Sequence, residues 1–349
     1  MAKGIAKKLI LLAIGLTVVL FAVNSSLAAS EPALQELYKA AKEEGQVIWQ
    51  YLGSVDLVEP LAKAFEAKYP GVKCTPFSFA GTGIHTRIIT EAGAGKLSLD
   101  VATSFPYLFL QLVGRDLLTK YDWTKIGVPP NDILLDGVSV SIFDSPNIWV
   151  YNTKLVSKAE APKTWNDVLD PKWKGSKISI RAAATPFAFL YPEWKKDKKK
   201  VEDSLEKLRK QEVVPGTRNS EVTSRIAGGE CPIGTIPIEM ALDLLKEGAS
   251  VAVCPVSPTA ASPIVVAIPK GVPHPNAAKL LIAWLHSREG REALRGKGLG
   301  PATPCNASPM AQLLCDNGIK YVPITSKEDL VEYDGAFSRM VVKTLGFMP

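Results

Sequence analysis

Histidine is scarce in this chain, which contains only His85, His274 and His286 at distant positions. No two cysteines have the close spacing of a zinc site, so neither residue type predicts a bound metal. The sequence also lacks Gly-x-Ser-x-Gly, His-Glu-x-x-His and Ser-x-x-Lys patterns in a supportive context. We therefore expect no catalytic residues, no metal ligands and no cofactor.

Long apolar runs are also lacking, except for residues 9–23, which follow a short basic start and precede small and polar residues up to Ser30. This order is typical of a secretory signal peptide. A membrane anchor is the alternative, but a spanning helix needs roughly 20 apolar residues and this run is shorter. We expect residues 1–29 to be a signal peptide, cleaved after Ala28 or Ala29. The mature protein is then expected to be soluble and periplasmic.

The excess of positive charge is small. The formal net charge is +6, and three lysines with no acidic residue lie in the expected signal peptide, which leaves 6 − 3 = +3 for the mature chain. One dense basic run, residues 195–200, lies beside a helical pattern and is interpreted as a solvated helix face. This mild basicity does not predict nucleic-acid binding.

Five cysteines occur in an expected oxidising compartment, where disulfides are permitted. The pairs nearest in sequence are Cys231 with Cys254 and Cys305 with Cys315, which leaves Cys74 over. Spacing alone does not fix the connectivity, so both pairings remain open at this point.

Strand-like and helical segments alternate along the chain. Apolar strand segments at 47–52, 72–79 and 100–102 are separated by helical patterns, and strand segments at 147–152, 177–180, 231–236 and 251–253 continue the theme. This alternation predicts an α/β fold with mostly parallel sheets flanked by helices. The mature length of about 320 residues is sufficient for two packed domains.

Glycine, serine and threonine are frequent in the turns that follow the predicted strands. In parallel sheets, ligands bind outside the carboxyl ends of the strands, and helix N-termini at such turns present amide hydrogens to carboxylates or phosphates. Plain helix capping is the alternative for each residue. The candidate ligand-binding residues from these turns are Ser54, Gly81, Thr82, Gly83, Ser104 and Thr185.

Several segments together resemble the extracellular solute-binding proteins of ABC importers, family 1, and in particular the branch that includes ferric-iron, thiamine and polyamine binders. The resemblance extends from about residue 45 to residue 300, and the chain after Pro301 matches poorly. Its most specific parts are Pro162-Lys163-Thr164-Trp165 and Asn276-Ala277-Ala278-Lys279. The other segments are the Gly81–Gly83 turn with residues 87–101, residues 150–153, Gly228-Gly229-Glu230 and residues 287–290.

The resemblance implies a type II periplasmic binding fold of two α/β lobes joined by a two-stranded hinge. The expected lobe 1 comprises residues 30–146 and 266–300, the expected lobe 2 residues 147–265, and residues 301–349 form a C-terminal segment without a lobe assignment. The resemblance further implies a protein that closes around a solute in the interlobe cleft and delivers it to an inner-membrane ABC permease. We expect a monomer.

Iron as the cargo disagrees with one part of the sequence. Ferric binders of this branch carry adjacent tyrosines at a place where this chain has Ile236-Pro237-Ile238, which supplies none of the anionic oxygen donors that ferric iron prefers. A ferric-iron or iron-complex binder therefore remains the first alternative. An exported hydrolase with His85 as a base is the second, although a helix-surface position is favoured for that histidine.

A small organic anion is the cargo that we hypothesise instead. Arginine forks suit carboxylates and phosphates, and Arg181 is the strongest candidate because it directly follows a predicted strand. Surface salt bridges are the alternative for Arg181 and for Arg87, Arg218 and Arg225. Further candidates from the second lobe are Tyr151, Thr185, Asn219 and Ser220, and an aromatic wall of Tyr51, Tyr107, Trp149 and Tyr151 is a possibility that competes with core packing.

Overall fold

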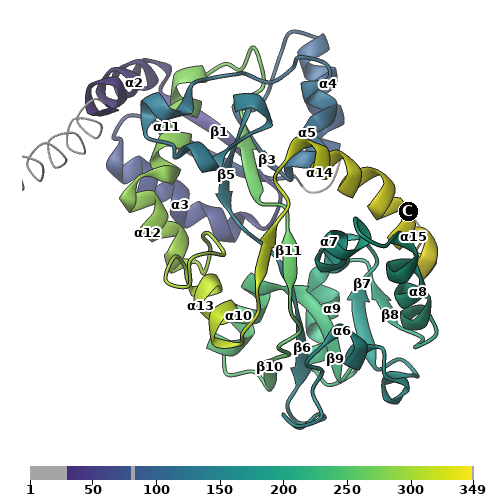
Figure 1. Ribbon diagram of the computed structural model, residues 1–349. Coiled ribbons are helices and arrows are strands. Elements are labelled where there is room, and N and C mark those ends of the chain that lie inside the picture. Colours follow the sequence, from purple (N-terminus) through teal and green to yellow (C-terminus); the bar gives the residue numbers. More distant parts are fainter. Residues whose placement is uncertain (1–29, 80–82, 348–349) are drawn as a thin grey trace, which may run out of the picture. The chain divides into compact units, whose positions relative to one another are not determined.

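The structure is a computed structural model that describes residues 30–79 and 83–347. The expected signal peptide and the turn residues Gly81 and Thr82 lie outside these residues. The described chain divides into two compact units (Figure 1). Unit 1 consists of residues 30–102, 118–140 and 267–290, and unit 2 of residues 103–117, 141–266 and 291–347. Each unit combines strands of a sheet with helices, which confirms the predicted α/β class.

A six-stranded sheet has the order β2-β1-β3-β12-β5-β4. Its strands β1, β2 and β4 belong to unit 1, whereas β3, β5 and β12 each contain residues of both units. β1 pairs in parallel with β2 and β3, whereas β4 pairs antiparallel with β5. The central strands β3 and β12 are buried at every position, as expected for strands covered on both faces. The bounds are β1 Gln46–Tyr51, β2 Lys73–Ser78, β3 Val101–Ser104, β4 Ile133–Leu134, β5 Ser139–Phe143 and β12 Ile264–Ala267.

The helices of unit 1 bury apolar stripes. In α3, Val58, Leu61, Ala62 and Phe65 are buried at the spacing of one helical face, which explains why the periodicity of this segment predicted a helix. α11 is buried along nearly its whole length and packs against α2. The helices are α2 Ser30–Glu44, α3 Val55–Lys68, α4 Gly83–Gly93 and α11 Pro275–His286, with short turns at η1 Trp123–Ile126, η2 Pro130–Asp132 and η3 Leu135–Gly137.

A buried carboxylate joins the sheet of unit 1 to the start of α11. Asp100 is fully buried and accepts hydrogen bonds from the backbone amides of Ile48 at 2.7 Å and His274 at 2.9 Å. Nδ1 of His274 lies 2.9 Å from the same carboxylate. A buried charge is tolerated only with such partners. His274 is therefore explained by this structural network, without a metal or a reaction.

A five-stranded sheet with the order β10-β6-β9-β7-β8 forms the framework of unit 2. β7 pairs in parallel with β8 and β9, but β6 pairs antiparallel with both β9 and β10. The sheet is thus mixed, because the sequence pattern predicts a strand but does not give its direction. The bounds are β6 Asn147–Asn152, β7 Ile178–Arg181, β8 Val214–Gly216, β9 Ile233–Pro237 and β10 Val251–Val253.

The core of unit 2 is formed by apolar side chains from this sheet and from α9, α10 and α13. Gly234 in β9 allows α9 to pack closely, since a Cβ atom at this position would lie 2.5 Å from Cδ1 of Ile226. The helices are α5 Pro106–Val113, α6 Trp165–Val168, η4 Pro171–Trp173, η5 Thr185–Leu190, α7 Tyr191–Trp194, α8 Lys198–Arg209, α9 Asn219–Ala227, α10 Ile238–Lys246 and α13 Pro309–Asp316. α12, Arg288–Gly296, begins in unit 1 and ends in unit 2.

The C-terminal segment after Pro301 belongs to unit 2. β11 Thr259–Ala261 pairs in parallel with β13 Tyr321–Pro323. The chain then continues through α14 Lys327–Glu332, the π-helix η6 Tyr333–Phe337 and α15 Ser338–Leu345, and α15 packs against α8 (Figure 1). In the described part of the chain, none of the helices combines the length and the apolar character that crossing a membrane requires.

One of the two cysteine pairings left open by the sequence forms a disulfide. Cys305 and Cys315 are bonded, with a Cα–Cα distance of 5.8 Å. Cys74, Cys231 and Cys254 are free and buried, so the pairing of Cys231 with Cys254 is wrong. The disulfide lies just before and within α13, in the segment for which the sequence offered no structural assignment.

Candidate functional site

Arg181 is the last residue of β7, and its side chain is the first in this strand to reach solvent, because Ile178, Ser179 and Ile180 are all buried. Nη1 of Arg181 donates a long hydrogen bond of 3.5 Å to Oγ1 of Thr185, at the start of η5. No carboxylate within the described residues forms an ion pair with this guanidinium. Two predicted site residues are thus brought together, with unused donor capacity on the arginine.

Two of the other candidate arginines, Arg87 and Arg225, differ from Arg181. Nε of Arg87 lies 2.7 Å from Oε1 of Glu91, and its guanidinium also covers the rings of Phe77 and Phe79. Arg225 forms ion pairs with two glutamates of unit 2, Glu221 and Glu230. The salt-bridge alternative therefore explains these two arginines, and the structure distinguishes Arg181 from them.

Two tyrosines accompany Arg181 in unit 2. Tyr107 of α5 and Tyr333 of η6 contact each other edge to face, with 5.8 Å between ring centroids, and Phe105 stacks on Tyr107 at 5.5 Å. Neither hydroxyl has a hydrogen-bond partner among the residues that the structure describes. Arg181 is close enough to act electrostatically on both hydroxyls. We call Arg181, Thr185, Tyr107 and Tyr333 the Arg181 cluster.

The two phenols of the Arg181 cluster are neutral. Burial raises the pKa of both Tyr107 and Tyr333 far above the ordinary value, and the opposing effect of Arg181 is smaller. Both hydroxyls therefore stay protonated at neutral pH and can donate or accept a hydrogen bond. The cluster thus offers one permanent positive charge and two neutral hydroxyls, a set suited to a carboxylate or phosphate.

Tyr333 is held in place by other aromatic residues of unit 2. Tyr191 contacts Tyr333 and Phe337 edge to face, with centroid distances of 5.6 and 5.5 Å. Tyr333 opens the π-helix η6, and such bulges occur frequently at functional sites. Tyr191 thus connects Tyr333 to the aromatic packing of unit 2.

The predicted turn residues of unit 1 have local roles. Ser54 is the N-cap of α3, and its hydroxyl accepts from the amide of Asp56 at 3.3 Å. Gly83 is the first residue of α4. Helix capping accounts for Ser54, and a ligand role for these residues stays a prediction.

The remaining predictions fall at the ends of elements in unit 2. Ser104 ends β3 and is buried, and Tyr151 is buried within β6. Asn219 and Ser220 are the first two residues of α9. The ligand role of these residues also stays a prediction.

Sequence reasoning missed Tyr333 as a site residue and considered Tyr107 only as one member of an aromatic wall. Tyr333 lies in the segment after Pro301, where the resemblance ends. The spacing of Tyr333 and Phe337 by four residues was the available signal, because it places two rings on one helical face. Nothing local, however, indicates that this face packs on Tyr107 and Tyr191.

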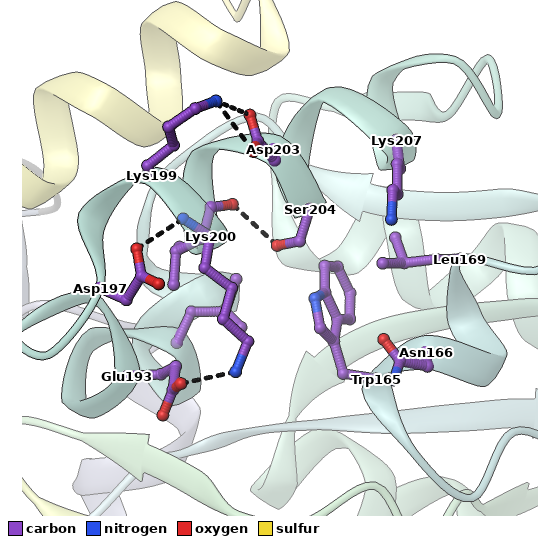
Figure 2. Close-up of a pocket in the computed structure, with 12 residues that line it drawn as sticks. Trp165, Asn166, Leu169, Glu193, Asp197, Lys199, Lys200, Asp203, Ser204 and Lys207 are labelled. Atoms are coloured by element: carbon purple, nitrogen blue, oxygen red, sulfur yellow. Dashed lines mark hydrogen bonds and ion pairs between the residues drawn. The ribbon is translucent and has the colours of Figure 1, made fainter.

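A surface pocket of about 490 Å³ lies elsewhere in unit 2, between α6 and α8. Figure 2 shows four of its charged side chains in two pairs, Lys199 with Asp203 and Lys200 with Glu193. The indole of Trp165 lines the pocket, and its Nε1 has no hydrogen-bond partner. None of the predicted ligand-binding residues lines this pocket. Because most of its charged side chains are paired within the pocket and none of the predicted residues lines it, we do not place the solute there.

Metal-binding groups are not gathered in the described part of the chain. No three histidine, cysteine, aspartate or glutamate side chains there could hold an ion together. Ile236 and Pro237 end β9 and are buried, so this position indeed supplies no oxygen donor from a side chain. His85 is 3% exposed, which corrects the expected position on the helix surface. His85 is buried because it lies on the inward-facing side of α4, together with the buried Ile84 and Ile88.

Three solved structures show the fold class to which this arrangement belongs. A substrate-binding protein of an ABC transporter from Agrobacterium tumefaciens is similar with a TM-score of 0.73, 17% identity, and coverage of 87% of this chain and 94% of that chain. Iron-bound HitA from Pseudomonas aeruginosa is similar with a TM-score of 0.69 and 20% identity, and the match covers 86% of this chain and 99% of that chain. AfuA from Actinobacillus pleuropneumoniae, described with fructose-6-phosphate bound, is similar with a TM-score of 0.66 and 20% identity. The match covers 87% of this chain and 98% of that chain. The fold is that of the two-lobed periplasmic binding proteins.

The sequence model of the bacterial extracellular solute-binding proteins matches residues 51–292, more than half of the chain. The chain therefore belongs to the family of bacterial extracellular solute-binding proteins, which confirms the resemblance found from the sequence. No curated protein sequence shows a significant match.

Proposed function

We propose that this protein is the periplasmic substrate-binding component of an ABC import system and that its cargo is a small organic anion. Family membership supports the transport role. The observation that carries the anion is the guanidinium of Arg181, which has no carboxylate partner in the described residues but has Thr185, Tyr107 and Tyr333 around it. An anionic ligand would complete the hydrogen bonding of these groups.

The proposal includes export through a cleaved signal peptide, function as a monomer without nucleic acid, and delivery to an inner-membrane permease. It also includes a hinge closure that buries the solute between two lobes. Closure is driven only if the solute contacts the closed form better than the open form. Family membership supports delivery to a permease and hinge closure, and the N-terminal sequence pattern supports export.

Ferric iron is less well supported as the cargo. One of the compared structures is iron-bound, so the fold is compatible with iron. In this chain, however, burial raises the pKa of Tyr107 and Tyr333, and a neighbouring arginine would repel a cation. Ferric iron prefers phenolate to phenol. AfuA, in contrast, is described with a sugar phosphate, an anion.

An exported hydrolase is the alternative from another class. Its candidate base, His85, is nearly inaccessible to solvent in α4. A base must come within hydrogen-bond reach of a substrate, and this position opposes such contact. We therefore propose that the protein binds its solute without converting it.

Thermal-shift measurements with a panel of carboxylates, organic phosphates, neutral sugars and cations test the anion proposal. The melting temperature of the purified mature protein should rise with the concentration of at least one anion, because a ligand that binds the folded state stabilises it by mass action. In Arg181→Gln the affinity for that anion should fall by about 10- to 100-fold.

Arg209→Gln is the matched control, since Arg209 is an exposed arginine of α8 in the same unit. Tight binding of a neutral sugar or a cation, with no response to any carboxylate or phosphate, would refute the anion proposal.

A further inference from the structure

An unpaired carboxylate lies beside the Arg181 cluster. Asp334 follows Tyr333 directly in the π-helix η6. It forms no hydrogen bond or ion pair with another described residue, and Arg339 influences it only through the longer-range field. The residue as a whole is exposed, but partial loss of hydration raises the pKa of its carboxyl group. A carboxylate in this situation gains from a cationic partner.

Asp334 and Arg181 act on the same two hydroxyls. The charge of Asp334 raises the pKa of both Tyr107 and Tyr333, and the charge of Arg181 lowers it, so both charges lie near the pair of rings. Nevertheless Asp334 and Arg181 do not form an ion pair with each other. The positive charge of Arg181 and the negative charge of Asp334 are therefore separate, and the contact between Tyr107 and Tyr333 lies near both.

The aromatic rings near Asp334 also favour a cationic group of the ligand. Phe105 stacks on Tyr107 with 12° between the ring planes, and Tyr333 meets Tyr107 edge to face. Aromatic faces attract ammonium groups, particularly where water is partly excluded. A ligand with only a negative group would satisfy Arg181 but would leave the charge of Asp334 compensated by water alone.

We propose that the solute is a zwitterion, with its carboxylate or phosphate bound by Arg181 and Thr185 and its ammonium group bound by Asp334 beside the rings of Phe105, Tyr107 and Tyr333. This inference rests on the proposed function, because it places the anionic group of the cargo at Arg181. It adds the cationic group, and with it the class of amino acids and other amino-carboxylates or amino-phosphates.

Isothermal titration calorimetry with matched probes tests the second charge. The probes are the standard amino acids, unbranched ω-amino acids and ω-aminoalkyl phosphates, each compared with the same acid lacking its amino group. The best zwitterion should bind at least about tenfold more tightly than its deaminated counterpart. Asp334→Asn should reduce the affinity for the zwitterion by about tenfold or more and change that for the deaminated acid by less than about threefold.

Asp203→Asn is the control, since Asp203 is an exposed carboxylate of α8 paired with Lys199, and it should leave both affinities unchanged. Equal affinities for the zwitterion and the deaminated acid, or an Asp334→Asn variant that binds the zwitterion normally, would overturn the inference while leaving the anion proposal intact. Failure of every acid and every zwitterion to bind, with Arg181→Gln behaving as the unsubstituted protein, would reject both.

Discussion

The hydroxyl of Tyr191 lies 2.9 Å from Oδ1 of Asp329, although 138 positions separate the two residues in the chain. Asp329 belongs to α14, and Lys195 pairs with the same carboxylate oxygen. Burial acts in the opposite direction, but the hydrogen bonds from Lys195, Ser326 and Tyr191 together lower the pKa of Asp329. These contacts join the C-terminal helices, and with them Tyr333, to the rest of unit 2.

Tyr191→Phe should therefore destabilise unit 2. Removal of the hydroxyl from a charged acceptor should lower the free energy of unfolding by about 1–2 kcal/mol at pH 7. The lowered pKa of Asp329 implies that its contribution is complete above the unfolded pKa and disappears as the pH falls through the folded pKa. Urea unfolding monitored by circular dichroism measures the change. Tyr38→Phe is a suitable control, because that hydroxyl makes an exposed hydrogen bond to the carbonyl of Pro70 in unit 1, and an equal loss in both variants would contradict the prediction.

Tyr333→Phe should separate binding from stability. The hydroxyl of Tyr333 has no partner among the described residues, so its removal should change the melting temperature very little. If this hydroxyl bonds the solute, the affinity should fall by about 5- to 15-fold, the equivalent of one hydrogen bond. Titration of the solute identified in the thermal-shift panel measures the effect. Unchanged affinity would remove Tyr333 from the site and leave Arg181 as its main determinant.

Glu239 should make the stability of unit 2 dependent on pH. It lies at the start of α10, with Oγ of Ser145 2.9 Å from both carboxyl oxygens, and burial raises its pKa from 4.5 to about 7. A raised carboxyl pKa means that stability is complete below the unfolded pKa and declines as the pH rises toward 7.

The Glu239→Gln variant should therefore have about the same free energy of unfolding as the unsubstituted protein near pH 5. Near pH 8 it should be more stable by about 1–3 kcal/mol. Thermal unfolding across this pH range provides the measurement. A stability difference between the two proteins that stays constant from pH 5 to pH 8 would show that Glu239 does not titrate there.

The disulfide between Cys305 and Cys315 should stabilise the C-terminal part of unit 2. It closes a loop with a sequence separation of 10, for which restriction of the unfolded chain contributes about 2–3 kcal/mol. Replacement of both cysteines by serine, measured by urea unfolding, should cost this amount. Addition of a reductant should reproduce the loss in the unsubstituted protein and have no effect on the double variant. Equal sensitivity of both proteins to the reductant would show that the loss does not come from this disulfide and would contradict the prediction.

Much of the fold could be predicted from local patterns. The run of apolar residues from Val47 gave β1 within one residue, and the helical spacing of Val58, Leu61 and Phe65 gave α3. Strand direction could not be predicted, because β6 has the same apolar character whether its neighbours run parallel or antiparallel to it. The C-terminal segment was also left unassigned, since its order depends on contacts with α8 and on a disulfide rather than on its own periodicity.

The candidate site was only partly predictable. Arg181 and Thr185 could be found because the rule that ligands bind at strand ends is a local one. Tyr333 and Asp334 could not, since they approach Tyr107 only after helices far apart in the sequence have packed. The same limit explains why spacing could not decide whether Cys231 and Cys254 pair, since closeness in sequence does not place two sulfur atoms together.

The aromatic packing around Tyr191 gives the protein an intrinsic fluorescent probe. Trp194 is 3% exposed, contacts the ring of Phe337 at 5.6 Å, and has the ammonium of Lys198 4.5 Å from its own ring centroid. An indole in such a dry setting emits at shorter wavelength than one in water. Six other tryptophans also emit, so the contribution of Trp194 is the difference between the emission of the protein and that of Trp194→Phe. A red shift in this difference would signal that η6 and α15 have separated from α7 and α8. Light emission from one side chain can thus follow the helix that carries Tyr333, without any added label.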